Sequence, residues 1–182
     1  QAVGNIIYVN DNASGANTGA SWTDAYRKLQ NALDAAAAGD QIWVAAGTYY
    51  PDEGTNHTNN NRAESFGLLN GVAIYGGFDT ADTQLSDRNP LVNITILSGD
   101  IDRNDTNIDG NKIAENVSHI QGSNAFNVVE SNFSVVDATA ILDGFVITAG
   151  KADGDPNQMT TVGAGMKLTS GDSPTLANLT FI

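Results

Sequence analysis

The chain has 182 residues, of which 41% are hydrophobic, and its 21 acidic and 8 basic residues give a formal net charge of −13. This length and composition suit a folded chain with a buried core, and no stretch approaches the roughly 18 apolar residues that a membrane-spanning helix needs. The negative charge argues against nucleic acid as a partner and against direct membrane insertion, and the absence of cysteine excludes disulfides and thiolate metal sites.

The first predicted elements are a short strand and one helix. Residues 6–9 (IIYV) form the strand, and a polar, turn-rich loop follows it. The segment 21–40 has the pattern of a helix, since Ser21 or Thr23 can cap its start and Gly39 can end it. Its narrow apolar stripe, spaced by three and four residues, consists of Ala25, Leu29, Leu33 and Ala36. We expect this helix to lie over the end of a sheet.

After the helix the apolar period changes to two residues, which indicates short strands. In the run 41–45, Ile42 and Val44 point one way and Trp43 the other, so we expect Trp43 either under the helical cap or exposed to contact glycans. Similar short runs follow at 71–78, 93–99, 124–131, 133–150, 164–171 and 175–182. In the middle of the chain the paired apolar positions recur about every twenty residues, with loop insertions between them.

Short repeats of strands with glycine-marked corners predict a parallel β-solenoid. One circuit of strands cannot bury its apolar face alone, and stacking the circuits buries it. The helix would shield the first circuit, and Gly47 would turn the next corner. A β-sandwich is the alternative, and the hairpin signal Asn70-Gly71 would fit it.

We expect one domain over residues 1–182. In it, residues 1–40 hold the first strand and the helical cap, and residues 41–182 hold the stacked strands and their loop insertions. The last apolar run stops inside a predicted strand, so we expect the sequence to be the N-terminal portion of a longer protein.

Four stretches carry a family resemblance: IYVNDNASGANTGASWTDAYRKLQNAL, GDQIWVAAGTYYP, ESFGLLNGVAIYGGFD and LDGFVITAGKADG. They resemble the N-terminal part of bacterial right-handed parallel β-helix repeat proteins, some of which are related to polymorphic outer-membrane adhesins. The resemblance implies an all-β fold, a right-handed parallel β-helix with an N-terminal capping α-helix. It also implies a secreted or cell-surface location in bacteria, with extracellular glycans or other surface proteins as partners. Similar folds occur in polysaccharide lyases, glycosidases and adhesins, so the resemblance does not define an activity.

The stretch SGDIDRNDTNIDGN, residues 98–111, is the richest cluster of possible metal ligands. Its candidate ligands for Ca²⁺ are Asp100, Asp102, Asn104, Asp105 and Asp109. The EF-hand pattern is not met, because aspartate replaces the glycine of its sixth position and asparagine the glutamate of its twelfth. The alternative is a solvated insertion whose Asp and Asn side chains form local turns. A second oxygen-rich loop contains Asp153, Asp155 and Asn157.

Candidate catalytic groups are few, and we assign no catalytic or cofactor-binding residue from the sequence. A polyuronate lyase would need a basic residue near calcium, and the candidates are Arg88, Arg103 and Lys112. We expect Arg103 to pair with the acids around it and Arg88 to fasten a corner. Glycoside hydrolysis needs two carboxylates, which Asp100 and Asp102 could supply from one strand face.

The histidines do not complete a catalytic pattern. His57 and His119 lie in polar contexts, and no Ser/His/Asp or zinc arrangement includes them. Three functions therefore stay open. The first is a non-catalytic extracellular domain of an adhesin, stalk or filament. The others are a polysaccharide lyase or glycosidase and a calcium-dependent glycan-binding module.

Overall fold

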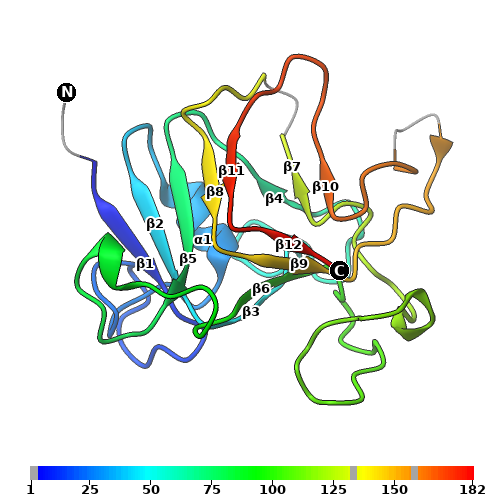
Figure 1. Ribbon diagram of the computed structural model, residues 1–182, viewed down its shortest axis with the longest axis horizontal. Coiled ribbons are helices and arrows are strands. Elements are labelled where there is room, and N and C mark those ends of the chain that lie inside the picture. Colours follow the sequence, from blue (N-terminus) through cyan, green and yellow to red (C-terminus); the bar gives the residue numbers. More distant parts are fainter. Residues whose placement is uncertain (1–3, 132–134, 157–159) are drawn as a thin grey trace.

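The computed structural model describes residues 4–131, 135–156 and 160–182 (Figure 1). It is mostly β-sheet, and the described part of the chain contains one α-helix, α1 (Leu29–Ala35). No helix among these residues is long and apolar enough to cross a membrane. Two short 3₁₀ turns, Leu85–Asp87 and Val117–His119, lie in loops.

The strands form three sheets, which we name A, B and C. Sheet A has the order β1-β2-β5-β8-β11, with strands Ile6–Val9, Gln41–Ala45, Ala73–Phe78, Ile141–Asp143 and Thr175–Ala177. Sheet B has the order β12-β9-β6-β3, with strands Thr180–Phe181, Val146–Thr148, Thr95–Ser98 and Gly47–Tyr49. Sheet C has the order β10-β7-β4, with strands Met166–Lys167, Val129–Glu130 and Phe66–Gly67.

From β2 onward the chain visits the sheets in a constant order. Strands β2, β3 and β4 lie in sheets A, B and C, and β5 to β7 and β8 to β10 repeat this order. Strands β11 and β12 then return to sheets A and B (Figure 1). We call each passage through the sheets a circuit. Every pairing between the described strands is parallel, so the hairpin-based sandwich is excluded.

The core consists of apolar side chains stacked in register. In sheet A, Ile42, Ile74 and Leu142 are aligned on neighbouring strands and are at most 2% exposed. Sheet B contributes an equivalent ladder, which consists of Tyr49, Leu97 and Ile147. Burying each aliphatic side chain of this size contributes roughly 1.5–3 kcal/mol before the entropy of folding is counted. The core therefore depends on neighbouring circuits covering one another.

The helix is much shorter than the sequence predicts. It begins after Lys28, and Ser21 and Thr23 lie well before it, so neither residue caps it. The reason is that Tyr26 pairs with the first strand: its N–H donates to the carbonyl of Tyr8, and its own carbonyl accepts from Asn10, both at 2.9 Å. Backbone groups used in this way cannot continue a helical ladder.

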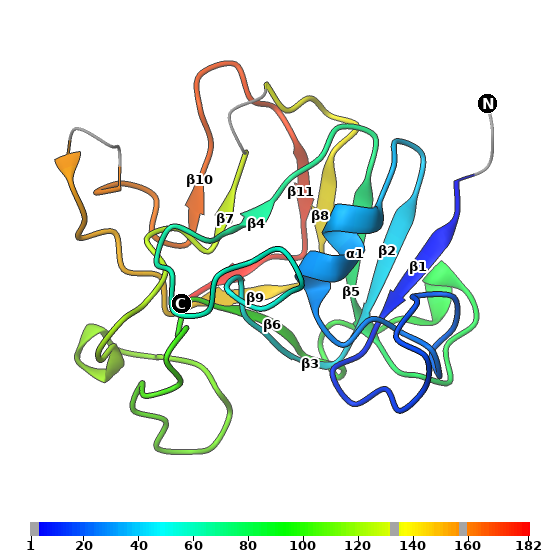
Figure 2. The same cartoon turned by 180° about the vertical axis from the view of Figure 1, so that it is seen from behind.

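The position of the helix agrees better with the prediction. Its buried residues include Leu29, Ala32 and Leu33, and it packs against β1, β2 and β4. Strand β4 is the terminal strand of sheet C, so α1 covers that edge (Figure 2). The chain then leaves the helix through Ala36, which is extended.

The predicted repeat of about twenty residues is wrong. Consecutive strands of sheet A begin at Gln41, Ala73 and Ile141, which are much further apart. The estimate compared strands of different sheets, since the same two-residue alternation occurs in all three. The run 133–150 likewise contains two strands, β8 and β9, that meet at a corner where Gly144 has a φ of +90°. Strands β3 and β4 were not among the predicted runs.

Trp43 is buried on the outer face of sheet A, so of its two predicted positions the exposed one is wrong, and aromatic rings cover it instead of the helix. Only 3% of its surface is accessible, because its ring stacks on Phe78 at a centroid distance of 4.6 Å and contacts Tyr8 edge-on. Trp22 covers this cluster and donates its indole N–H to the carbonyl of Asp82 at 2.8 Å. The loops before α1 and after β5 are thereby joined over the sheet.

Candidate functional site

The acidic stretch forms the start of a long loop between β6 and β7. Asp100 accepts the backbone N–H of Asn104 at 3.0 Å, and the amide of Asn104 donates to Asp102 at 2.9 Å. The charge of Asp105 acts on Asp100, and that of Asp102 acts on both. The structure therefore brings four of the five predicted calcium ligands into one cluster.

Asp109 does not join this cluster. Its carboxylate accepts the backbone and side-chain N–H groups of Asn111 at 3.2 and 2.9 Å, which is a local turn. Within the described residues, no hydrogen bond joins Asp109 to the other four predicted ligands. Moreover, no group of three or more His, Asp or Glu side chains within the described part of the chain is arranged to hold a metal ion.

Burial and mutual repulsion disfavour the charged forms of the carboxylates in this cluster. Burial raises the pKa of Asp100, and the negative charge of Asp105 raises it further. Burial also raises the pKa of Asp105, although hydrogen bonds from Gln121 and Asn124 oppose this effect. Oδ1 of Asp102 is buried and has no hydrogen-bond partner among the described residues. The cluster thus carries more negative charge than its present partners neutralise.

Arg103 does form ion pairs, but with different acids from those predicted. Its Nη2 lies 3.3 Å from Oδ1 of Asp52 and 3.0 Å from Oε1 of Glu53, which follow β3. Its guanidinium lies 3.6 Å from the ring centroid of Tyr50. Arg103 therefore fastens the acidic loop to the preceding circuit. Lys112, the third basic candidate, lines the small cavity beside the cluster.

Arg88 fastens a corner, as predicted. Its Nη2 lies 2.5 Å from Oδ2 of Asp143, and its Nη1 donates to the carbonyl of Gly76 at 3.1 Å. The side chains of Arg88 and Asp143 are only 14% and 13% exposed, so the pair is mostly shielded from water. The guanidinium also lies 5.2 Å from the ring centroid of Tyr75. This arrangement holds the loop after β5 against the next circuit.

The two histidines lie in separate loops. His57 Nδ1 is 2.7 Å from Oε2 of Glu64, and its Nε2 is 3.7 Å from Oδ1 of Asp34 on α1. Nearby, the amide of Gln30 donates to the carbonyl of Pro51 at 2.6 Å. His57 therefore helps to fix the segment 51–65 across the helix. His119 lies 3.3 Å from Glu115 in the long loop between β6 and β7.

The second oxygen-rich loop is fixed by the side chain of Arg62. Asp153 forms an ion pair with Arg62 and another, at 3.7 Å, with Lys151. Asp155 follows in the same loop, and Asn157 lies outside the described residues. Asp153 is therefore used to join this loop to the segment before β4.

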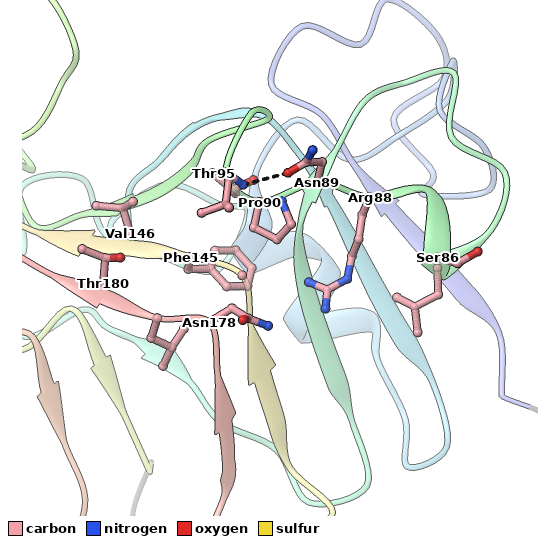
Figure 3. Close-up of a pocket in the computed structure, with 13 residues that line it drawn as sticks. Ser86, Arg88, Asn89, Pro90, Thr95, Phe145, Val146, Asn178 and Thr180 are labelled. Carbon is pink, nitrogen blue, oxygen red and sulfur yellow. Dashed lines mark hydrogen bonds between the residues drawn. The ribbon is translucent and has the colours of Figure 1, made fainter.

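A groove that the sequence did not indicate lies at the corner between sheets A and B (Figure 3). It encloses about 530 Å³, and one wall is the loop from Leu85 to Leu91. The rest is formed by Thr95 of β6 and by the corners of the last two circuits, at residues 144–146 and 178–180. These segments are distant in sequence, so only the stacking of circuits brings them together.

The corner beside the groove has strict backbone requirements. Gly144 and Asn178 directly follow the aligned strands β8 and β11, and Gly76 lies inside β5 at the position that continues the same alignment. A Cβ atom on Gly144 would lie 2.7 Å from Nη1 of Arg88, and Asn178 has a φ of +48°. Glycine and asparagine tolerate a positive φ better than other residues do. The Asn178 amide also donates to Oδ1 of Asp143 at 2.7 Å, which completes the polar cluster under the groove.

No protein-family model, no curated protein and no solved structure matches this chain.

Proposed function

We propose that this chain is a right-handed parallel β-helix domain of a bacterial secreted or cell-surface protein, where it acts as a non-catalytic scaffold in an adhesin, stalk or filament. The observation that supports the proposal most is the constant order of sheets A, B and C with in-register parallel ladders. A stack of this kind is stiff along its length and holds its loops at fixed positions.

The uses of the charged side chains favour a scaffold over an enzyme. Arg88 and Arg103, the arginines that a lyase could use as bases, are both held in ion pairs that fasten loops between circuits. Asp143 and Asp153 serve the same purpose. Groups fixed in this way stabilise a surface of loops, which suits binding to extracellular glycans or other surface proteins.

The test combines turnover and binding. The purified domain is incubated with soluble polyuronates and neutral glycans, with calcium and with EDTA, and unsaturated or reducing products are measured. It is also mixed with insoluble glycans and whole bacterial cells and recovered by sedimentation. We expect binding without product. Product formation that calcium restores would instead support the alternative of a polysaccharide lyase or glycosidase.

A second candidate is a calcium-stabilised loop, and the excess negative charge at Asp100, Asp102 and Asp105 favours it. Calcium would relieve the repulsion by drawing the carboxylates toward one ion. We predict that EDTA lowers the melting temperature by several degrees and that calcium restores it. Asp102→Ala should abolish this response, whereas Asp109→Ala should keep it. An equal response of both variants would contradict a site in this cluster.

A further inference from the structure

We propose that the corner groove between sheets A and B binds a neutral oligosaccharide. This inference rests on the proposed function and names a ligand class and a site for it. Three properties of the groove carry it: its size, the chemistry of its lining and the charge around it.

The size of the groove suits a short chain of sugar rings. Its volume of about 530 Å³ lies within the range of sites for small ligands. One wall comes from a loop of the β5 circuit, and the opposite side comes from the corner of the last circuit, at Asn178 to Thr180 (Figure 3). The ligand would therefore lie over the corner of the β8 circuit, at residues 144–146, which separates these two walls.

The lining combines uncharged polar groups with apolar surface. Asn178 contributes an amide, Thr180 a hydroxyl and Pro90 an apolar wall. The Ser86 hydroxyl points away from the groove (Figure 3), and Oδ1 of Asn89 already accepts the backbone N–H of Leu91 at 3.2 Å. Sugar rings present both a rim of hydroxyl groups and apolar C–H faces, so they can use both kinds of surface. Nδ2 of Asn178 is bonded to Asp143, and its Oδ1 has no hydrogen-bond partner among the described residues. This oxygen is left to accept a ligand hydroxyl.

The charge distribution favours a neutral ligand. Arg88 is the charged residue of the lining, and its ion pair with Asp143 cancels its charge locally. The chain as a whole has a net charge of −13, which repels polyanionic glycans. A uronate polymer would find neither a free cation in the groove nor a favourable field outside it.

The test is a binding titration with defined oligosaccharides. Neutral cello-, xylo- and manno-oligosaccharides are compared with oligogalacturonates by calorimetry and by amide NMR shifts. We expect at least one neutral oligosaccharide to bind and to shift the signals of Arg88 and Asn178. Oligogalacturonates should bind at least tenfold more weakly.

Two variants locate the site. Thr180→Trp should fill the groove and weaken binding at least tenfold, whereas Thr161→Trp, at another exposed threonine, should leave it unchanged. Asn178→Gly keeps a residue that tolerates positive φ but removes the amide, and should weaken binding about three- to tenfold. Asn60→Gly, at another asparagine of positive φ outside the groove, is the matched control.

Two results would overturn the inference. One is tighter binding of oligogalacturonates than of neutral oligosaccharides. The other is neutral binding that Thr180→Trp does not weaken although the variant melts as the parent does. If the domain still sediments with glycans or cells in either case, the scaffold function stands and only this site is rejected. If nothing is bound in any assay, both proposals fail.

Discussion

The first and last edges of the sheets differ in how much of their apolar surface is covered. At the first edge, α1 covers β4 and buries Leu29, which is 2% exposed. At the last edge, Leu176 is 40% exposed, although its aligned neighbour Leu142 is 1% exposed. Phe181 is 52% exposed beside the buried Ile147. Burial at a ladder position therefore comes from the neighbouring layer, which is a circuit or the helix.

The largest effect is expected at the helix-covered edge. Leu29→Asp places an unpaired carboxylate in a buried site and should destabilise the fold by about 4 kcal/mol, or prevent folding. Ala35→Asp, on the exposed side of α1, should change the free energy of unfolding by less than about 1 kcal/mol. Urea denaturation measures both. Similar values for the two variants would mean that the helix does not seal this edge.

A matched pair of leucines compares the middle of the stack with its last edge. Leu142→Ala should cost about 3 kcal/mol, because it leaves a cavity between two circuits. Leu176→Ala, at the aligned position one circuit later, should cost under about 1.5 kcal/mol, because water already reaches this side chain. Chemical denaturation of both variants tests the difference. An equal loss would show that the ladder position alone determines the energy.

Phe181 tests whether the last edge attracts other molecules. Phe181→Ser should lower self-association and the binding of an apolar dye, since it removes the largest exposed ring of that edge. The free energy of unfolding should fall by less than about 1.5 kcal/mol. Sedimentation velocity and dye fluorescence are the measurements. Leu91→Ser, at a side chain that is 90% exposed in the loop after β5, is the control.

The smallest effect is a pH response at the helix-covered edge. Partial burial raises the pKa of Glu64, but hydrogen bonds from His57, Thr58 and Asn61 outweigh this effect and hold the pKa below its ordinary value. A carboxyl group whose pKa is lowered by folding stabilises the fold at pH values above its ordinary pKa. This contribution is lost as the pH falls through the lowered pKa. Hydrogen exchange of Thr58 should therefore become about two- to threefold less protected at low pH. In Glu64→Gln this change should vanish.

Local patterns in the sequence predicted some of the individual elements, but not all of them. The strands 6–9 and 41–45 occur with the predicted bounds, because short runs of β-branched and aromatic residues are a local signal that neighbouring polar and turn residues delimit. The helix was predicted too long because the backbone of Tyr26 pairs with β1. The apolar periodicity of the sequence gives no sign of this contact. The corner groove could not be predicted, since it joins residues 85–91 to residues 178–180 through stacking alone.

The candidate metal ligands also show that local spacing can be read from the sequence, whereas contacts between circuits cannot. Asp100, Asp102 and Asp105 are close in sequence, and a single loop keeps them close in space. Asp109 is almost as near in sequence, yet a local turn with Asn111 directs its carboxylate elsewhere. The partners of Arg103 were also missed, because Asp52 and Glu53 belong to the preceding circuit. Spacing can identify a cluster, but pairing between circuits decides its members.

The loop between β6 and β7 has a practical consequence for protein engineering. Strand β6 of sheet B ends at Ser98, where the long loop begins. Strand β7 of sheet C begins at Val129, which is in regular register with Phe66. Alignment is thus set where the strands pair and is independent of the length between them. Foreign peptides could be grafted at this point, and the framework would display them without changing its own spacing.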